Sequence, residues 1–243
     1  MRPFKDRVKD VTYSKRAEYE TRRKELAQAI READRAPGTA LRDFLFPEAP
    51  SYEHHGDHSV CGYRDGSDNG RDTESRLCRC LYFLHSPSES ISRPRQEEKC
   101  RRCTYPHKPA FRGDGYRLLD YEVAVPCNHK RGIDLVWEGP DGKTYAVEVK
   151  PQDSAETILR MVAEIRTYTL FLPEWNGVKL WPAICFFQKR EDGTSDSAQW
   201  VEYLGEKDKE DFRTILSGVH VFYFTVEHGV HILHDGEKEP ICR

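Results

Sequence analysis

Apolar residues gather into segments of strand length in the second half of the chain. Residues 116–125, 132–138 and 144–150 predict three strands separated by turn-forming residues. The Pro-Asp-Gly sequence at 140–142 supplies turn chemistry between the second and third segments. We therefore expect these two strands to form an antiparallel hairpin.

Helical and strand patterns alternate after the hairpin. An amphipathic helix is predicted at about 154–172, with a capping box at Asp153 and Glu156, and Pro173 ends it. A strand at about 178–188 follows.

The C-terminal part continues the pattern. It predicts a strand near 199–204, a helix over 207–216 and a hairpin that joins 220–226 to 230–234. The element order predicts an α/β protein.

Composition divides the chain into three parts. Residues 1–46 predict a helical N-terminal arm, because 4–35 are rich in Lys, Arg, Glu and Ala, and we expect it to be mostly exposed. Residues 47–114 predict a loop-rich insertion, since Ser, Gly, Pro, His and Cys dominate and apolar runs are short. Residues 115–243 hold the α/β core and a C-terminal extension.

Charge and hydropathy narrow the class of protein. Hydrophobic residues make up 37% and charged residues 33%, with 38 Lys and Arg against 41 Asp and Glu. This mixture argues against wholesale disorder, and no apolar run approaches the roughly 20 residues of a membrane span. The N-terminus has no apolar signal segment, so we expect a cytoplasmic protein. Basic residues outnumber acidic ones in 1–36 and 90–132, which favours a polyanionic partner.

Charged residues interrupt two of the predicted core strands. Asp134 lies in the second strand, and Glu148 and Lys150 lie in the third. A period of two puts Glu148 and Lys150 on one face of the sheet, and the hairpin brings Asp134 across from Glu148. Two carboxylates held together in this way predict a site for a hard divalent cation, and Mg²⁺ is the natural occupant.

This pattern, Asp134 followed by Glu148-Val149-Lys150, resembles the Asp…Glu-x-Lys signature of the PD-(D/E)XK nuclease superfamily, which has the restriction-endonuclease-like fold. The resemblance covers about residues 115–190. The superfamily core is a mixed sheet in the order helix, three antiparallel strands, helix, strand, and the predicted segments follow the same order. The resemblance therefore implies a fold of the α+β type, with a mixed sheet flanked by helices. A Glu-x-Lys triplet alone is a weak signal.

The resemblance implies a role for each residue of the motif. Asp134 and Glu148 would ligate Mg²⁺ or Mn²⁺, the carbonyl of Val149 would add a ligand, and Lys150 would orient or help to deprotonate the attacking water. Many members carry a further upstream acid, for which Glu122 is the candidate.

The function that the resemblance implies is that of a Mg²⁺-dependent endonuclease that hydrolyses phosphodiester bonds of DNA. Its substrate would be double-stranded DNA, and its role would be restriction or defence. A homodimer would cut both strands. Three alternatives stay open. These are a catalytically inactive nuclease-fold module that binds nucleic acid or a protein, a zinc-containing scaffold protein, and a buried ion pair without chemistry.

A helical pair found in some relatives is incomplete in this chain. Those relatives place Gln and, four residues on, Tyr in the helix after the motif, whereas this sequence has Glu164 and Tyr168. The Glu puts in doubt any assignment to the exonuclease-like branch that uses the pair.

Two closely spaced cysteine pairs predict a structural zinc site. Cys78 and Cys80 form one pair and Cys100 and Cys103 the other. Cys61, His85 or His107 are alternative ligands for the less typical Cys-x-Cys half, and an iron–sulfur cluster is the alternative occupant. Basic residues near the second pair and the motif predict contacts with nucleic-acid phosphates, namely Arg101, Arg102, Arg112, Lys130 and Arg131.

Overall fold

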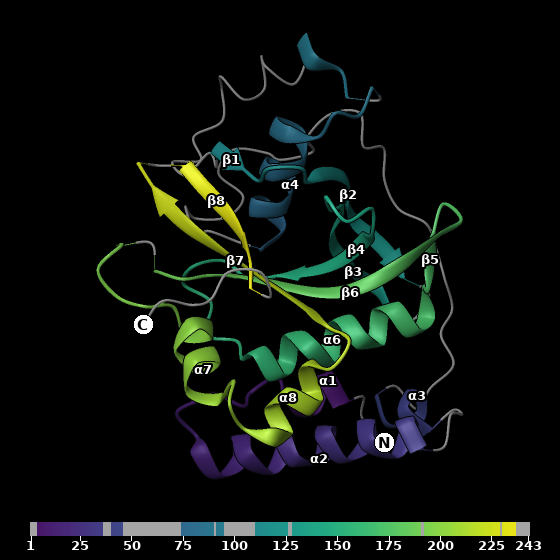
Figure 1. Ribbon diagram of the computed structural model, residues 1–243, viewed down its shortest axis with the longest axis vertical. Coiled ribbons are helices and arrows are strands. Elements are labelled where there is room, and N and C mark those ends of the chain that lie inside the picture. Colours follow the sequence, from purple (N-terminus) through teal and green to yellow (C-terminus); the bar gives the residue numbers. More distant parts are fainter. Residues whose placement is uncertain are drawn as a thin grey trace.

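A mixed sheet with helices on both faces forms the centre of the protein (Figure 1). The computed structural model describes residues 4–35, 40–45, 74–89, 91–94, 110–125, 128–190, 192–228 and 230–236. The sheet has the order β1-β8-β7-β6-β4-β3-β2, and the short strand β5 (Glu174–Trp175) pairs with β6 alone. None of the helices in these ranges is long and apolar enough to cross a membrane.

Three antiparallel strands, which correspond to the three predicted apolar segments, make up one end of the sheet. They are β2 (Arg117–Val125), β3 (Asn128–Glu138) and β4 (Thr144–Val149), with β3 in the middle. The predicted hairpin is confirmed, because Glu138 pairs with Thr144 and the turn lies between them.

The strands after the motif join the sheet in parallel. Strand β6 (Val178–Phe187) lies parallel to β4, and β7 (His220–Glu227) lies parallel to β6. Strand β8 (Val230–Asp235) completes the predicted C-terminal hairpin with β7, and β1 (Ala110–Arg112) adds a parallel edge strand beside it.

Helix α6 (Ile158–Phe171) packs beneath the central strands and connects β4 to β6 (Figure 1). The helix begins later than its capping-box pattern predicts, because Thr157 is the N-cap and its hydroxyl accepts from the amide of Arg160. It ends before Pro173, as predicted, since proline cannot continue a helix.

The predicted strand at 199–204 is wrong. These residues belong to helix α7 (Ala198–Glu206), whose N-cap Ser197 accepts a hydrogen bond from the amide of Trp200. The strand prediction failed because the buried face of α7 carries polar residues, which hide the helical period of its apolar positions. Helix α8 (Glu210–Leu216) follows, close to the prediction.

The N-terminal segment forms α1 (Phe4–Arg7) and α2 (Arg16–Arg35), followed by α3 (Ala40–Leu45). The predicted helices are confirmed, but α2 is less exposed than expected. One of its faces is buried, with Tyr19, Leu26 and Ile30 in the same apolar cluster as α6 and α8. The N-terminal helices therefore form an outer layer on the α6 side (Figure 1).

Helix α4 (Glu74–His85) covers the opposite face, in a part of the chain for which composition predicts loops. Its apolar residues, including Leu81 and Phe83, pack in a second core cluster with Trp137 and Phe222. The two core clusters thus lie on the two faces of the sheet, and α4 is placed by burial of apolar side chains.

A buried carboxylate joins three helices on the α6 side. Glu202 of α7 accepts hydrogen bonds from the Tyr19 hydroxyl at 2.7 Å and from the amides of Ile158 and Leu159 at 2.8 and 3.3 Å. It lies at the N-terminus of α6, where the free amides and the helix dipole favour negative charge. Burial nevertheless raises the pKa of Glu202 to about 7, although these hydrogen bonds lower it.

The raised pKa of Glu202 predicts that the protein loses stability as the pH rises. The pKa of about 7 lies above the ordinary value of 4.5, so the folded state holds the proton more tightly than the unfolded chain. The contribution is therefore present below about pH 4.5 and is lost as the pH rises to about 7, with a size of roughly 3 kcal/mol. Urea unfolding of wild type and Glu202→Gln from pH 4.5 to 8 measures it. The difference in the free energy of unfolding between wild type and Glu202→Gln should change by this amount over that pH range. A difference that does not depend on pH would refute the raised pKa of Glu202.

Candidate metal and catalytic site

The motif residues meet where β4 ends. Glu148, on β4, and Lys150, just after it, are 2% and 1% exposed. Their side chains lie on one face, as the strand period predicts, with Lys150 Nζ 2.6 Å from a Glu148 carboxylate oxygen. Asp134 on the adjacent strand β3 accepts a hydrogen bond from the amide of Val149 at 2.8 Å, which fixes the orientation of its carboxylate.

A close approach of β2 and β3 precedes Asp134. A Cβ atom at Gly132 would lie 1.9 Å from the carbonyl oxygen of Val123, so this position requires glycine. The Gly-Ile-Asp sequence therefore serves two purposes, because it lets the strands approach and then presents the acid.

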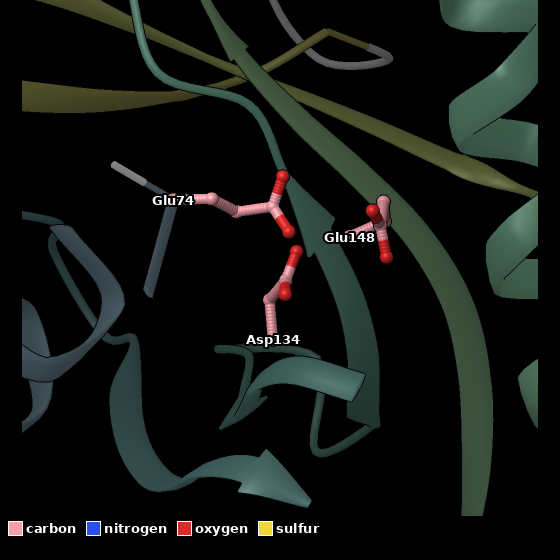
Figure 2. Close-up of side chains that lie close together, drawn as sticks. All are labelled: Glu74, Asp134 and Glu148. Atoms are coloured by element: carbon pink, nitrogen blue, oxygen red, sulfur yellow. The ribbon is translucent and has the colours of Figure 1, made fainter. Parts of the chain in front are cut away.

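A third carboxylate comes from α4. Glu74, the first residue of that helix, points toward Asp134 and Glu148 (Figure 2). One oxygen from each of the three carboxylates lies within 4.8 Å of the others. Sequence reasoning missed Glu74, because no motif or spacing links residue 74 to the hairpin.

Lys150 is the centre of a dense ionic network. Its ammonium group lies 2.5 Å from Glu74, 3.0 Å from Glu156 and 3.6 Å from Glu164, in addition to Glu148. Burial lowers the pKa of Lys150, but the surrounding carboxylates outweigh burial and raise that pKa well above its ordinary value. Lys150 is therefore an ammonium ion in this arrangement.

Arg160 provides the second positive charge. Its guanidinium group lies 2.6 Å from Glu156 and 3.2 Å from Glu164, both on the α6 side of the site. Two cations thus face five carboxylates, which are Glu74, Asp134, Glu148, Glu156 and Glu164.

Burial, and after it the neighbouring carboxylates, raise the pKa values of Asp134 and Glu148. Burial raises the pKa of Asp134 well above its usual range, Glu74 adds to the effect, and Lys150 and the Val149 amide oppose it. Burial likewise raises the pKa of Glu148, with Asp134 as the next cause. A divalent cation among these oxygens would remove the repulsion.

The donor set fits Mg²⁺ or Mn²⁺. Both are hard cations that prefer carboxylate oxygens. Opposite ligands of Mg²⁺ lie about 4 Å apart, so oxygens within 4.8 Å need to move little to share one ion. Glu74, Asp134 and Glu148 are the residues that would hold it.

Glu164 and Tyr168 of α6, which occupy the places of the Gln and Tyr pair, both lie beside the site. Glu164 is 3% exposed and pairs with Arg160, and Tyr168 is 2% exposed. Burial raises the pKa of the Tyr168 hydroxyl, and Glu148 and Glu164 are the next causes. The Glu in place of Gln therefore adds negative charge at the site itself.

Glu122 does not belong to the acidic cluster, in contrast to its predicted place at the metal. Its carboxylate accepts a hydrogen bond from Ser75 and pairs with Arg79 at 3.0 Å. Glu74 of α4 approaches Asp134 and Glu148 instead. Helix α4 packs against β2, and the third carboxylate of the cluster comes from α4 instead of β2.

The first predicted zinc pair lies in α4. Cys78 is buried in the apolar cluster on that face, whereas Cys80 is partly exposed. Two residues correspond to about 200° around a helix, so these side chains point to different sides and are poorly placed to bind one ion together. Cys100 and Cys103 lie outside the described residues, as do the alternatives Cys61 and His107, and the zinc site stays a prediction.

Most of the predicted basic contacts are not located. Arg101 and Arg102, together with the side chains of Lys130 and Arg131, lie outside the described residues. Arg112 is exposed on β1, at the opposite end of the sheet order from β2. There it lines a cavity of about 500 Å³.

No protein-family model and no curated protein matches the chain. A solved structure described as a repair endonuclease from Pyrococcus abyssi is similar over 39% of this chain and 35% of its own length, with 18% identity and a TM-score of 0.24. The match thus spans about a third of that protein, and at this TM-score it carries no argument about function.

Glu74 provides a test of the cluster that is independent of the sequence motif. Glu74→Gln should weaken Mn²⁺ binding at least about ten-fold, since even residues that only support metal ligands change affinity by this factor. Isothermal titration calorimetry measures the effect, and Glu89→Gln, at an exposed position after α4, is the matched control. Equal affinities in wild type and Glu74→Gln would remove Glu74 from the site.

Proposed function

We propose that the protein is a metal-dependent nuclease that hydrolyses phosphodiester bonds of DNA. One observation carries the proposal, namely the convergence of Glu74, Asp134, Glu148 and Lys150 at the end of β4. Three carboxylates and an ammonium group form a site for a divalent cation beside a group able to contact a phosphate or a water molecule.

Each residue has a role in this proposal. Glu74, Asp134 and Glu148 bind Mg²⁺ or Mn²⁺, and the carbonyl of Val149 adds a ligand by the resemblance described above. Bound Mg²⁺ would lower the pKa of water and neutralise charge that develops on the phosphate. Lys150 orients the attacking water and stabilises negative charge on the phosphate oxygens, a role that suits an ammonium ion.

The supporting helix α6 limits the movement of Lys150. Glu164 and Glu156 lie on one side of its ammonium group, and Arg160 balances both of them. When a cation neutralises Glu74 and Glu148, Glu164 on α6 and Glu156 just before it still hold Lys150 beside the ligands. The water-deprotonating role is less favoured, because the same carboxylates oppose loss of the lysine proton.

The proposal also covers the form of the substrate, the assembly, the biological role and a second metal. These are double-stranded DNA as the substrate, a homodimer that cuts both strands, a role in restriction or defence, a cytoplasmic location, a structural Zn²⁺ in the cysteine-rich segment, and phosphate contacts by the basic residues that include Arg101 and Arg102. The proposed division at residues 46 and 114 belongs with them.

A non-catalytic nuclease-fold module that binds nucleic acid is the second candidate. Its specific support is the ionic network itself, because Lys150 already pairs with two of the three proposed metal ligands. An ion pair of this kind is able to serve structure alone.

Cleavage assays decide between the two candidates. Supercoiled plasmid, linear duplex, single-stranded DNA and RNA are incubated with Mg²⁺, Mn²⁺ or EDTA, at several salt concentrations. Metal-dependent cutting of DNA that EDTA abolishes supports the nuclease. Binding that weakens steeply with salt but never leads to cleavage supports the module.

A further inference from the structure

The position of Glu74 depends on how α4 is docked. Asp134 and Glu148 lie on adjacent strands within the sheet. Glu74 is the first residue of α4, which covers the face of the sheet opposite α6. The first turn of a helix is its least constrained part, because its amides lack partners within the helix. Contacts that hold this turn against the sheet therefore decide whether Glu74 reaches the other acids.

The distal half of α4 is held by aromatic packing. Tyr82 and Phe83 contact Tyr121 of β2, with ring centroids 4.9 and 5.3 Å apart. These contacts lie two turns away from Glu74 along the helix, since a turn has 3.6 residues. Leu77 and Cys78 are buried in the same cluster, so apolar packing anchors the body of the helix, whereas Glu74 and Ser75 are partly buried and are held by polar contacts.

Glu122 connects the first turns of α4 to β2. Its carboxylate accepts a hydrogen bond from the hydroxyl of Ser75, the neighbour of Glu74. Arg79 donates to both carboxylate oxygens of Glu122, with Nη2 at 3.0 and 3.2 Å. Ser75 and Arg79 are four residues apart and share one helix face, so a single carboxylate clamps two successive turns.

Glu122 also has an unusual backbone conformation. Its φ of +48° lies in the left-handed region, which residues with a Cβ rarely adopt. Its neighbours Tyr121 and Val123 pair with Leu135 and Ile133, so Glu122 stands opposite Asp134. Such local strain persists only where surrounding contacts hold it, and it is often found at functional sites.

We infer that Glu122 is a positioning residue, which through Ser75 and Arg79 holds α4 so that Glu74 joins Asp134 and Glu148 at the cation site. The role of the assembled site rests on the proposed function. The clamp differs from a metal ligand, because Glu122 acts through α4 and its charge is balanced by Arg79.

A charge swap tests the clamp. The single variants Glu122→Lys and Arg79→Glu place like charges together and should weaken Mn²⁺ binding about ten-fold, the usual effect of losing a supporting contact. The double variant restores an ion pair of opposite polarity and should recover most of the affinity. Arg117→Glu with Glu138→Lys, a swap of an exposed 2.9 Å pair between β2 and β3, is the matched control and should change nothing.

Two outcomes overturn the inference. One is unchanged Mn²⁺ affinity in both single variants, and the other is a double variant no tighter than the singles. Thermal unfolding shows whether each variant is folded. Glu122→Gln, which removes the charge but keeps the shape, replaces Glu122→Lys if the latter does not fold and should weaken binding in the same direction.

Hydrogen exchange separates a failure of the clamp from a failure of the proposed function. If wild type cuts no DNA but binds Mn²⁺, the affinities above still decide the clamp. If wild type binds no Mn²⁺, amide exchange from Cys78 to Tyr82 in α4 decides it. Faster exchange in the singles that slows again in the double variant supports the clamp, and unchanged exchange overturns it.

Discussion

Replacing Asp134 with asparagine is expected to reduce Mg²⁺-dependent DNA cleavage by at least about a thousand-fold, since the substitution removes a charged ligand from the centre of the site. The fold should survive, because an asparagine oxygen is still able to accept the hydrogen bond from the Val149 amide. Burial and Glu74 already raise the pKa of Asp134, so loss of this charge should leave stability unchanged or higher.

The same variant distinguishes a functional site from a structural ion pair. Mg²⁺ should raise the unfolding temperature of wild type and should have little effect on Asp134→Asn. Asp120→Asn is the control, because Asp120 lies on β2 outside the cluster and accepts a hydrogen bond from the Tyr121 amide. Cleavage by Asp134→Asn at the wild-type rate would refute the proposed site.

Replacing Lys150 with methionine is expected to cause the largest loss of stability, about 3–5 kcal/mol at neutral pH, as for the removal of one partner from a buried ion pair. Methionine keeps the length of the side chain, so packing changes little. The loss is electrostatic, because Glu148 and Glu164 are both 3% exposed in their side chains and would lose the ammonium group that pairs with both, while Arg160 remains beside Glu164.

The effect of this substitution should depend on pH and on metal. Burial raises the pKa values of Asp134 and Glu148, so these acids take up protons readily and the loss should shrink as the pH falls. Saturating Mg²⁺ should restore roughly 3 kcal/mol when it is present at about a hundred times its Kd. Urea unfolding at pH 5 and 7.5, with and without Mg²⁺, measures both effects.

An exposed ion pair of equal length provides the control for Lys150. Lys189 lies 2.6 Å from Asp196, and its side chain is 44% exposed. Lys189→Met should cost no more than about 1 kcal/mol, because solvent screens exposed pairs. Equal costs at the two lysines would show that the network around Lys150 is not electrostatically coupled.

The hairpin and its acids were predictable because they follow local rules. Strand alternation placed Glu148 and Lys150 on one face, and the turn at 140–142 brought Asp134 beside them. Helix α7 was mistaken for a strand, since buried Glu202 and Glu206 interrupt the apolar period on which the prediction depended.

The amino-acid sequence by itself determined the hairpin of β3 and β4, helix α6 and the strand segments on either side of them, because turn residues and apolar periods act over short distances. Only the tertiary structure decided that α4 packs on the face opposite α6 and brings Glu74 to Asp134 and Glu148. It also decided that Glu122 pairs with Arg79. The physical reason is that α4 docks through contacts between residues far apart in the chain, and no local pattern encodes such contacts.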